Sequence, residues 1–453
     1  MDATRKTSRQ PVNESQLLIS RDALLHNAAI IKRALANETP PIARPASPQK
    51  SSAAQSPGAP YLKLHLDESN QDIKPSVLPR ICAVVKADAY GLGAEHVVDA
   101  LYNFSSEEIQ GPAVDALAVA NVDEADALPA TSLPVIIFRP VENGLIRQQR
   151  AQIEAAIRNN WTMTVGSAAA ANDIARIAMS IHGMALVQIM VDTGLTRTGI
   201  CEKDFMDVLG TIVGLPSLRL TGIGTHFSSA DQIDNPATAE QIRQFRDCTD
   251  RPLELLRKSH QHRIHRHAAN SAGIFLHPTS HFDMVRPGLS LYGLDPLMKP
   301  CTDRKLKPVM KWIAPLVNVR EVAAGTKVGY GQTWTTPRAT KIGLVPVGYA
   351  DGYLRAFSNQ AKMMIDNKPV PVVGTVSMDY TAIDLGPNSA ARTGDTVTVL
   401  DDDPLSPASV YSLANIAKTI PYEILCRIGP RIARVMKEPE DGEQGETGMR
   451  IGH

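Results

Sequence analysis

The sequence predicts a (β/α)8 barrel of the TIM type, followed by a mainly β C-terminal domain. At 453 residues the chain is too long for one hydrophobic core, because single cores rarely grow beyond roughly 250–300 residues. Up to about residue 300, short apolar runs alternate with helix-like segments. After that point, short strands are separated by Gly, Pro, Asp and Asn turns and show little helical periodicity.

A repeated rhythm of strands and helices carries the barrel prediction. The apolar runs, many of them rich in β-branched residues, span residues 81–86, 116–120, 134–138, 161–165, 184–191, 219–224, 263–267 and 282–286. Helical periodicity fills several of the gaps, at 143–158, 167–180 and 237–258. About eight such units favour a closed barrel. An open, doubly wound sheet has the same local pattern and is the alternative that periodicity leaves open.

The predicted division of the chain places the barrel at 15–300 and the β-rich domain at 301–436. Ser20 is expected to cap a helix that ends near residue 37. Residues 38–74 are rich in Pro, Ser, Ala and Gln, which predicts a flexible insertion at the N-terminal end of the barrel, away from an active site. The polar ends, 1–14 and 437–453, are expected to be disordered. Expected elements of the β-rich domain are strands at 316–321, 341–347, 370–373 and 396–400 and a helix at 413–418.

Composition and charge argue against several classes of function. The 47 basic and 47 acidic residues balance, which gives no electrostatic case for binding nucleic acid or an anionic membrane. The 5 cysteines are scattered without a CxxC or Cys/His cluster, so neither a metal nor a disulfide framework is expected. The N-terminus lacks the apolar core of a signal peptide, and no apolar run reaches the roughly 18 residues of a membrane span. We therefore expect a cytoplasmic enzyme for a small molecule, with no nucleic-acid or membrane partner.

Polar residues gather where the barrel strands are expected to end, which is where barrel enzymes carry their reactive groups. In chain order these candidates are Lys86, Asp192, Arg197, His226, His267, Asn270, Ser271, Arg286 and Gly288. They would form a basic, hydrogen-bonding rim with few carboxylates. Phosphate groups often bind near the last two strands of such barrels, where Ser271 and Gly288 could supply a hydroxyl and backbone donors.

Several of these residues have a structural explanation as well as a functional one. Lys86 ends the apolar run ICAVVK, and either extends into water or is a buried amine whose lowered pKa lets it form a Schiff base. Arg286 either binds an anion near the barrel axis or forms a structural ion pair. His226 and His267 are either part of the site or ordinary histidines at the edge of the core. Tyr330, between glycines in KVGYGQTW, is either a turn residue or a general acid–base group.

The segment AVVKADAYGLG, at 83–93, resembles the alanine racemase family. The similarity continues in the family's order through VDTGLTRTG (191–199), GIGTHFSSAD (222–231), HAANSAG (267–273), MVRPGLSLYG (284–293), VGYG (328–331), GYADGY (348–353), VGTVSMD (373–379) and PYEILCRI (421–428). One motif would be weak evidence, whereas this ordered series from about residue 15 to 436 is specific. The resemblance implies a barrel that binds pyridoxal 5'-phosphate (PLP), a β-rich domain and a homodimer with composite sites.

The resemblance also implies a role for each matching residue. Lys86 would bind PLP covalently and act as one catalytic base, and Tyr330 of the other subunit would act as the second base. The implied cofactor-binding residues are Lys86, Tyr90, His226, His267, Ser271, Arg286, Gly288, Leu289 and Tyr422, with Arg286 at the pyridine nitrogen. Arg197 and the backbone of Met378 would bind the substrate carboxylate, Tyr349 would line the entrance, and His226 and Asp379 would support Tyr330. The implied reaction interconverts L- and D-alanine and supplies D-alanine for peptidoglycan synthesis.

The chain departs from the family pattern at three places. Met190 stands where many members carry a lysine that becomes carbamylated and supports the substrate-binding arginine, so Arg197 must be held differently here. Thr375 and Ser377 replace the more usual Arg and Cys near Met378. The third departure is the insertion at 38–74.

Three other functions compete with this interpretation. A PLP decarboxylase of the same architecture would need a carboxylate opposite the pyridine nitrogen, and Arg286 argues against that. A non-catalytic PLP-binding protein made of the barrel alone would not need the β-rich domain that carries Tyr330 and Tyr422. A pseudo-enzyme is disfavoured because both predicted bases are present.

Overall fold

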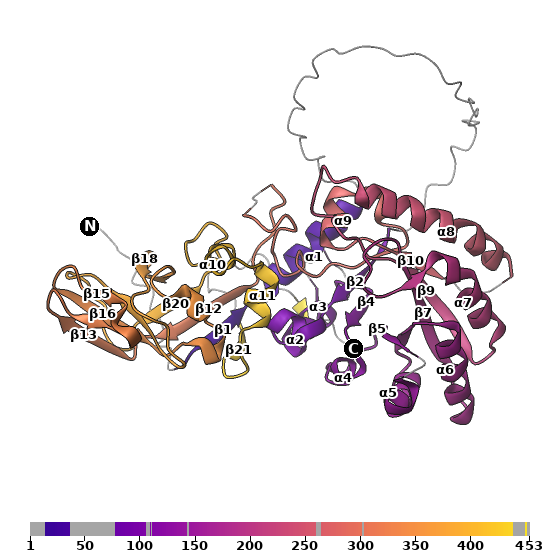
Figure 1. The fold of residues 1–453 in the computed structure, drawn as a ribbon, viewed down its shortest axis with the longest axis horizontal. Helices are drawn as coiled ribbons and strands as arrows, with labels where there is room; N and C mark the ends of the chain where they lie inside the picture. Colours follow the sequence, from indigo (N-terminus) through magenta and orange to yellow (C-terminus); the bar gives the residue numbers. More distant parts are fainter. Residues whose placement is uncertain are drawn as a thin grey trace, which may run out of the picture.

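The computed structural model describes residues 14–36, 78–105, 109, 111–142, 145–259, 264–300, 303–437 and 449–450. The predicted insertion at 38–74 lies outside the described residues. So do the predicted disordered ends, apart from residues 14, 437 and 449–450. The described part has two bodies side by side, a barrel wrapped by helices and a smaller β-rich domain (Figure 1).

Eight parallel strands close into a barrel, which confirms the predicted fold class. The strand order is β2-β4-β5-β6-β7-β9-β10-β11, and β11 pairs with β2 to complete the ring. This closure excludes the open doubly wound sheet. The barrel strands are β2 (Arg80–Val84), β4 (Ala116–Val119), β5 (Val135–Val141), β6 (Thr162–Val165), β7 (Ala185–Asp192), β9 (Leu218–Gly224), β10 (His265–His267) and β11 (Met284–Val285), with a short β8 (Ile200–Cys201) paired to β7.

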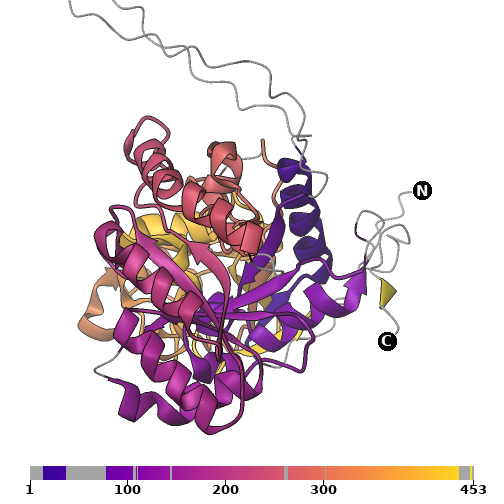
Figure 2. The ribbon, with the colours of Figure 1, turned by 90° about the vertical axis from the view of Figure 1, so that its right-hand side faces the viewer.

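Helices lie around the outside of the barrel strands (Figure 2). Ser20 caps α1 as expected, since its side chain accepts a hydrogen bond from the Ala23 N–H. Ser167 caps α6 in the same way, and that helix then buries its apolar face. The helices are α1 (Arg21–Leu35), α2 (Lys86–Gly91), α3 (Ala94–Asn103), α4 (Val122–Asp126), α5 (Ile146–Arg158), α6 (Ala168–Ser180), α7 (Glu202–Gly214), α8 (Ala237–Ser259) and α9 (Ser271–Leu276).

The C-terminal part is mainly β, as predicted. One sheet has the order β18-β17-β20-β12-β1-β21 and another the order β13-β16-β19. Their strands are β12 (Met310–Pro315), β13 (Asn318–Val322), β16 (Thr340–Val345), β17 (Lys362–Ile365), β18 (Lys368–Pro371), β19 (Thr381–Asp384), β20 (Thr396–Leu400) and β21 (Ala433–Met436). A hairpin of β14 (Lys327–Val328) and β15 (Trp334–Thr335) and the helices α10 (Val410–Ala417) and α11 (Pro421–Cys426) complete it. A separate pair, β3 (Phe104–Ser105) with β22 (Met449–Arg450), lies outside both domains' sheets.

The N-terminal strand β1 (Gln16–Ile19) belongs to the β-rich domain, whereas the predicted division placed residues from 15 onward with the barrel. It pairs antiparallel with β12 and parallel with β21. Leu17 and Ile19 are fully buried there. The four residues of β1 give no indication in the sequence of the sheet to which they belong. Their place is set by the folded domain, in which β1 fills the gap between β12 and β21.

The β-rich domain reaches back to the mouth of the barrel through α11. Gly91, at the end of α2, has φ +82° and leaves so little room that a Cβ there would meet the Leu425 carbonyl oxygen at 2.5 Å. Arg434 donates to the carbonyl oxygens of Gly91 and Ile428, both at 2.8 Å. The two domains therefore meet beside the turn that carries Lys86.

Candidate active site

A cavity of about 790 Å³ opens at the C-terminal ends of the barrel strands. This size is within the range of small-molecule and cofactor sites. Ten of the predicted residues line it: Lys86, Tyr90, Arg197, His226, Asn270, Ser271, Arg286, Gly288, Leu289 and Tyr422. His267 is fully buried behind Arg286 and does not line the cavity. All but Tyr422, which α11 contributes, come from the barrel.

Lys86 begins an unusual turn directly after strand β2. The next four residues, Ala87 to Tyr90, have φ between 51° and 61°, the left-handed region that non-glycine residues avoid at a cost of roughly 1–2 kcal/mol each. The Ala89 N–H donates to the Val85 carbonyl at 2.8 Å, and the Ala94 N–H donates to the Asp88 carboxylate at 2.7 Å. Strain of this kind persists where the surrounding structure enforces it, commonly at functional sites. Here it holds Lys86 at the mouth of the barrel.

Glu124, which the sequence did not single out, supports this turn from the neighbouring strand end. One of its carboxylate oxygens accepts from the Ala87 N–H at 3.1 Å, and the other accepts from the Ala120 N–H at 2.8 Å. Asn121 in turn accepts from the Glu124 N–H at 2.9 Å. The sequence shows that Glu124 follows strand β4 closely. It does not show that Glu124 reaches Ala87, because that contact depends on β2 and β4 being neighbours in the barrel.

The Lys86 amine sits in an environment that disfavours its charged form. Burial, followed by the nearby Arg197 guanidinium, lowers the pKa of Lys86, while the Glu124 carboxylate raises it. A lowered pKa increases the fraction of neutral amine at neutral pH, and only the neutral amine is nucleophilic.

We expect Glu124→Gln to lower the pKa of Lys86 further, because the substitution removes the carboxylate that stabilises its ammonium form. The rate at which a lysine-selective reagent modifies Lys86 in PLP-free protein, followed against pH by mass spectrometry, measures this. The reactivity midpoint should move to lower pH in Glu124→Gln and stay in place in Glu154→Gln, a change on the outer helix α5. A midpoint unchanged in Glu124→Gln would contradict the electrostatic role.

Arg286 is held in one position by four side-chain hydrogen bonds. Its guanidinium donates to His267 Nδ1 at 2.6 Å and His226 Nδ1 at 3.2 Å, and to the carbonyl oxygens of Thr225 at 2.7 Å and Ala268 at 3.1 Å. Burial lowers the pKa of Arg286 to about 10, so it stays charged at neutral pH. Burial and the Arg286 charge lower the pKa of His226 to about 3 and that of His267 well below its ordinary value. Both imidazoles are therefore neutral acceptors.

One wall of the cavity is suited to a phosphate group. Ser271 Oγ accepts from the N–H groups of Gly288 and Ser290, both at 3.1 Å. The neighbouring Leu289 N–H has no hydrogen-bond partner within the described ranges, although Leu289 is fully buried and lines the cavity. A Cβ at Gly288 would lie 2.3 Å from the Tyr90 hydroxyl, so only glycine leaves this concave wall open. A buried, unpaired N–H calls for an acceptor, and a phosphate oxygen meets that need.

Tyr90 is fixed within a group of aromatic rings. Its ring centroid lies 4.9 Å from that of Tyr292 and 5.6 Å from that of Tyr422. Tyr292, which sequence reasoning passed over inside the LSLYG segment, donates to the Val84 carbonyl at 2.8 Å. This bond ties the phosphate wall to Val84 at the end of strand β2, two residues before Lys86.

The loop that carries Arg197 is arranged by Asp192. One oxygen of this carboxylate accepts from the N–H groups of Gly194 and Leu195, each at 2.9 Å, and of Thr196 at 3.1 Å. Met190 and Arg197 both line the cavity, and a thioether cannot be carbamylated as a lysine can. Among the residues that the structure describes, the Arg197 guanidinium has no hydrogen-bond or ion-pair partner, which leaves it available to an anion.

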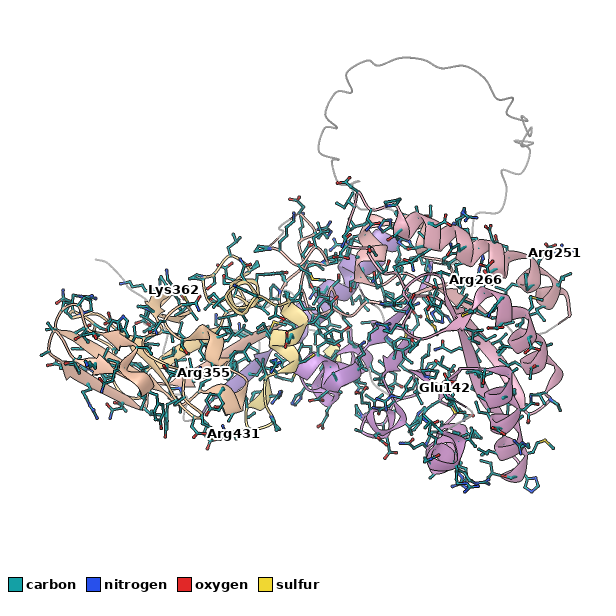
Figure 3. The ribbon with its side chains drawn as sticks, in the orientation of Figure 1. Glu142, Arg251, Arg266, Arg355, Lys362 and Arg431 are labelled. Carbon is teal, nitrogen blue, oxygen red and sulfur yellow. The ribbon has the colours of Figure 1, made fainter. Side chains whose placement is uncertain are left out.

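The remaining predicted residues lie in the β-rich domain and do not line this cavity. Tyr330 is 76% exposed, Met378 53% and Tyr349 43%. Asp379, predicted to support Tyr330, forms an ion pair with Arg431 at 3.0 Å, and Arg431 also pairs with Asp351 at 3.0 Å. Arg431 is labelled on the β-rich domain in Figure 3.

Two loops that carry these exposed residues interlock. The Tyr349 N–H donates to the Ser377 carbonyl and the Ala350 N–H to the Met378 carbonyl, each at 3.0 Å. A Cβ at Gly348 would meet the Met378 carbonyl at 2.2 Å. Tyr349 and Met378 are thus presented together on one exposed surface of the domain.

Within the described ranges, no group of three or more His, Cys, Asp or Glu side chains could hold a metal ion. The helices of the same ranges are all too short or too polar to cross a membrane.

Comparisons with known proteins identify the family. A model of the alanine racemase N-terminal domain matches residues 66–296, and one of the alanine racemase C-terminal domain matches residues 309–436. The chain belongs to the alanine racemase family. It is 36% identical over 362 residues to the alanine racemase of Chlorobaculum tepidum, a match that covers 79% of this chain and 88% of that one. The enzyme is therefore a PLP-dependent isomerase that interconverts L- and D-alanine.

Solved structures of racemases share the fold of this enzyme. The alanine racemase of the D-cycloserine producer Streptomyces lavendulae has a TM-score of 0.74 at 26% identity, over 95% of this chain and 98% of that one. The alanine racemase of Bartonella henselae, solved with covalently bound PLP, has a TM-score of 0.71 at 22% identity, over 94% of this chain and 100% of that one.

Proposed function

We propose that the enzyme racemises alanine by a two-base mechanism, in which Lys86 serves one face of the substrate and Tyr330 of the partner subunit serves the other. The observation that carries this proposal is the position of Lys86. Its amine, with a lowered pKa, lies in one cavity with a firmly held Arg286 and with Arg197, whose guanidinium has no partner among the described residues. Racemisation removes the α-proton from one face and returns a proton to the other, so bases on opposite faces suffice.

PLP would be held along the walls of this cavity. Lys86 would bind it covalently, and Tyr90, Ser271, Gly288, Leu289 and Tyr422 would hold its phosphate, where the unpaired Leu289 N–H supports the assignment. Bound PLP supplies an electron sink that makes the α-proton of the amino acid acidic. His226 and His267 act behind the cofactor by accepting hydrogen bonds from Arg286.

The chain's own residues orient the substrate and move its protons. Arg197, together with the backbone of Met378 of the partner subunit, would receive the substrate carboxylate. Lys86 Nζ takes up or returns a proton on one face of the α-carbon, and Tyr330 Oη of the partner subunit does so on the other.

Tyr349 and Tyr422 would crowd the side-chain pocket, which favours alanine over longer amino acids. A methylene group changes binding by only about 1–3 kcal/mol, so slow turnover of serine is expected as well.

The homodimer is part of this proposal because Tyr330 does not line the cavity of its own subunit. Its 76% exposure and that of Met378 and Tyr349 support a surface that completes the site of a second copy.

The product D-alanine would supply peptidoglycan synthesis. We place the enzyme in the cytoplasm, which the free thiols of Cys82, Cys201, Cys248 and Cys426 support.

The direct test is a polarimetric assay of purified, PLP-loaded protein with L-alanine and with D-alanine. Both enantiomers should converge to the same racemic mixture. Decarboxylation of either enantiomer, or an optical rotation that stays unchanged for both, would contradict the proposal.

We expect Arg286→Glu to increase transamination relative to racemisation. A carboxylate at the pyridine nitrogen favours its protonated form, which is a stronger electron sink, whereas the charged Arg286 leaves that nitrogen unprotonated. Pyruvate formed from alanine, measured with lactate dehydrogenase, reports transamination. The control Arg286→Lys keeps the positive charge and should keep the ratio of pyruvate to racemised alanine low. An unchanged ratio in Arg286→Glu protein that still binds PLP would overturn this role of Arg286.

A further inference from the structure

A chain of hydrogen bonds runs from Arg286 through the barrel interior to a backbone carbonyl on a distant strand. Arg286 Nη1 bonds His267 Nδ1 at 2.6 Å, and His267 Nε2 bonds Gln188 Oε1 at 3.0 Å. Gln188 Nε2 donates to Thr164 Oγ1 at 2.8 Å, and Thr164 Oγ1 donates to the Ile137 carbonyl at 2.7 Å. The chain thus links the end of β11 to β10, β7, β6 and β5. The PLP-binding proposal has no role for Gln188 or Thr164.

The two ends of this chain determine the direction of every bond in it. A guanidinium can only donate, and a backbone carbonyl can only accept. His267 must therefore accept at Nδ1 and carry its proton on Nε2, which it donates to Gln188. The Gln188 amide must then direct its oxygen to His267 and its NH2 group to Thr164, because the Thr164 hydroxyl hydrogen is already used by Ile137. Reversing any one link would place two donors or two acceptors face to face.

Burial makes each link costly to lose. His267 and Gln188 are 0% exposed, Thr164 is 2% and Arg286 is 3%. His267 and Gln188 are closed off from solvent and lie outside the cavity, so water does not replace a missing partner there, and a buried polar group without a partner is strongly unfavourable. Loss of one hydrogen bond in this series would therefore leave its neighbours without a correctly oriented partner. The Ile137 carbonyl, at the end away from the cavity, fixes the orientation of the His267 ring through Thr164 and Gln188.

We propose that Gln188 and Thr164 are positioning residues that hold His267 as an acceptor and thereby keep the Arg286 guanidinium aimed into the cofactor cavity. Neither residue lines the cavity, so both act through His267 and Arg286. This inference rests on the proposed role of Arg286 at the cofactor.

The first test is the tautomer of His267 in the PLP-free protein. Nitrogen NMR of isotopically labelled histidine distinguishes the two neutral tautomers and the imidazolium, and His267→Asn identifies the signal. The expected result is the neutral form with its proton on Nε2. A signal of the Nδ1-protonated form or of the imidazolium would overturn the direction of the chain.

The second test compares three substitutions at two threonines on the same strand. Thr164→Val removes the hydroxyl without changing the side chain's shape, and should raise the PLP dissociation constant about tenfold. Thr164→Ser retains the hydroxyl and should bind PLP within about twofold of the unaltered protein. Thr162→Val is the matched control, because Thr162 lies two residues away on β6 and is also buried. Within the described part of the chain, its hydroxyl bonds only to the Thr221 hydroxyl, at 3.4 Å.

Melting of the PLP-free variants separates positioning from general destabilisation. If Thr164→Val and Thr162→Val lower the melting midpoint alike and only Thr164→Val weakens PLP binding, the proposal is supported. Equal loss of PLP binding in both variants, or none in Thr164→Val, overturns it. Gln188→Met, of similar length and without polar atoms, should weaken PLP binding as Thr164→Val does, and unaltered binding would count against the proposal. Failure of the unaltered protein to racemise alanine would instead refute the proposed function and leave these results standing.

Discussion

Lys86→Ala should abolish racemisation, with a loss of at least about a thousandfold in turnover, since one residue is proposed both to bind the cofactor and to move a proton. The neighbouring turn makes this position irreplaceable. Ala87 to Tyr90 are all in the left-handed region, and Glu124 holds the Ala87 N–H, so the turn after β2 fixes Lys86 at the cavity. Polarimetry with L- and D-alanine measures the loss.

A second measurement, of PLP bound to Lys86, separates covalent cofactor binding from catalysis. Unaltered protein should retain PLP through gel filtration and, after borohydride reduction, carry the cofactor mass on the peptide with Lys86. Lys86→Ala should retain no reducible PLP on that peptide. The control Lys307→Ala changes a lysine outside the cavity and should racemise alanine as the unaltered protein does. Full activity in Lys86→Ala would disprove the central assignment.

Tyr330→Phe should lower racemisation on the order of a thousandfold, because it removes the proton donor and acceptor proposed for the other face of the substrate. The ring remains, so packing and dimer formation should not change. Sedimentation of the variant checks the dimer, and borohydride labelling of Lys86 checks that PLP is still bound. Tyr380→Phe, which alters another exposed tyrosine of the same domain, is the matched control.

Mixing the two inactive variants tests whether each site is built from two chains. In a hybrid of Lys86→Ala and Tyr330→Phe subunits, one composite site carries both substitutions and the other carries neither. Random exchange in an equimolar mixture should therefore restore about a quarter of the normal activity. Activity that stays at the level of the separate variants would show that Lys86 and Tyr330 do not meet across a dimer interface.

Motifs and periodicity predicted the barrel well because each barrel strand is a short, buried run whose signal is local. All eight predicted runs overlap a strand of the closed ring, from β2 (Arg80–Val84) to β11 (Met284–Val285). The β-rich domain was harder to predict. Strand β12 (Met310–Pro315) was not predicted, and β1 (Gln16–Ile19) completes a sheet whose other strands begin almost 300 residues later.

Many of the residues that line the cavity could be predicted from their positions after strand ends. The residues that support them through hydrogen bonds could not be predicted in this way. Lys86, Ser271 and Arg286 follow strand ends, and chain order alone places such positions at one mouth of a barrel. Glu124, Gln188 and Thr164 act through partners on other strands, at positions that depend on how the strands stand beside each other. Which residues of two parallel strands lie side by side is settled only when the strands, separated by a crossover connection in the sequence, pair in the folded barrel.

The family, the barrel and the identity of the side chains at its mouth could be predicted without a structure, because they follow from ordered motifs and from hydrophobic runs along one chain. The folded structure was needed to show that Tyr330 does not line the barrel cavity and that Asp192 shapes the loop of Arg197. It also decided that Arg286 is tied to Ile137 through three buried side chains. These are relations between strands and domains, and directional hydrogen bonds in a dry interior form only once the chain has closed around them.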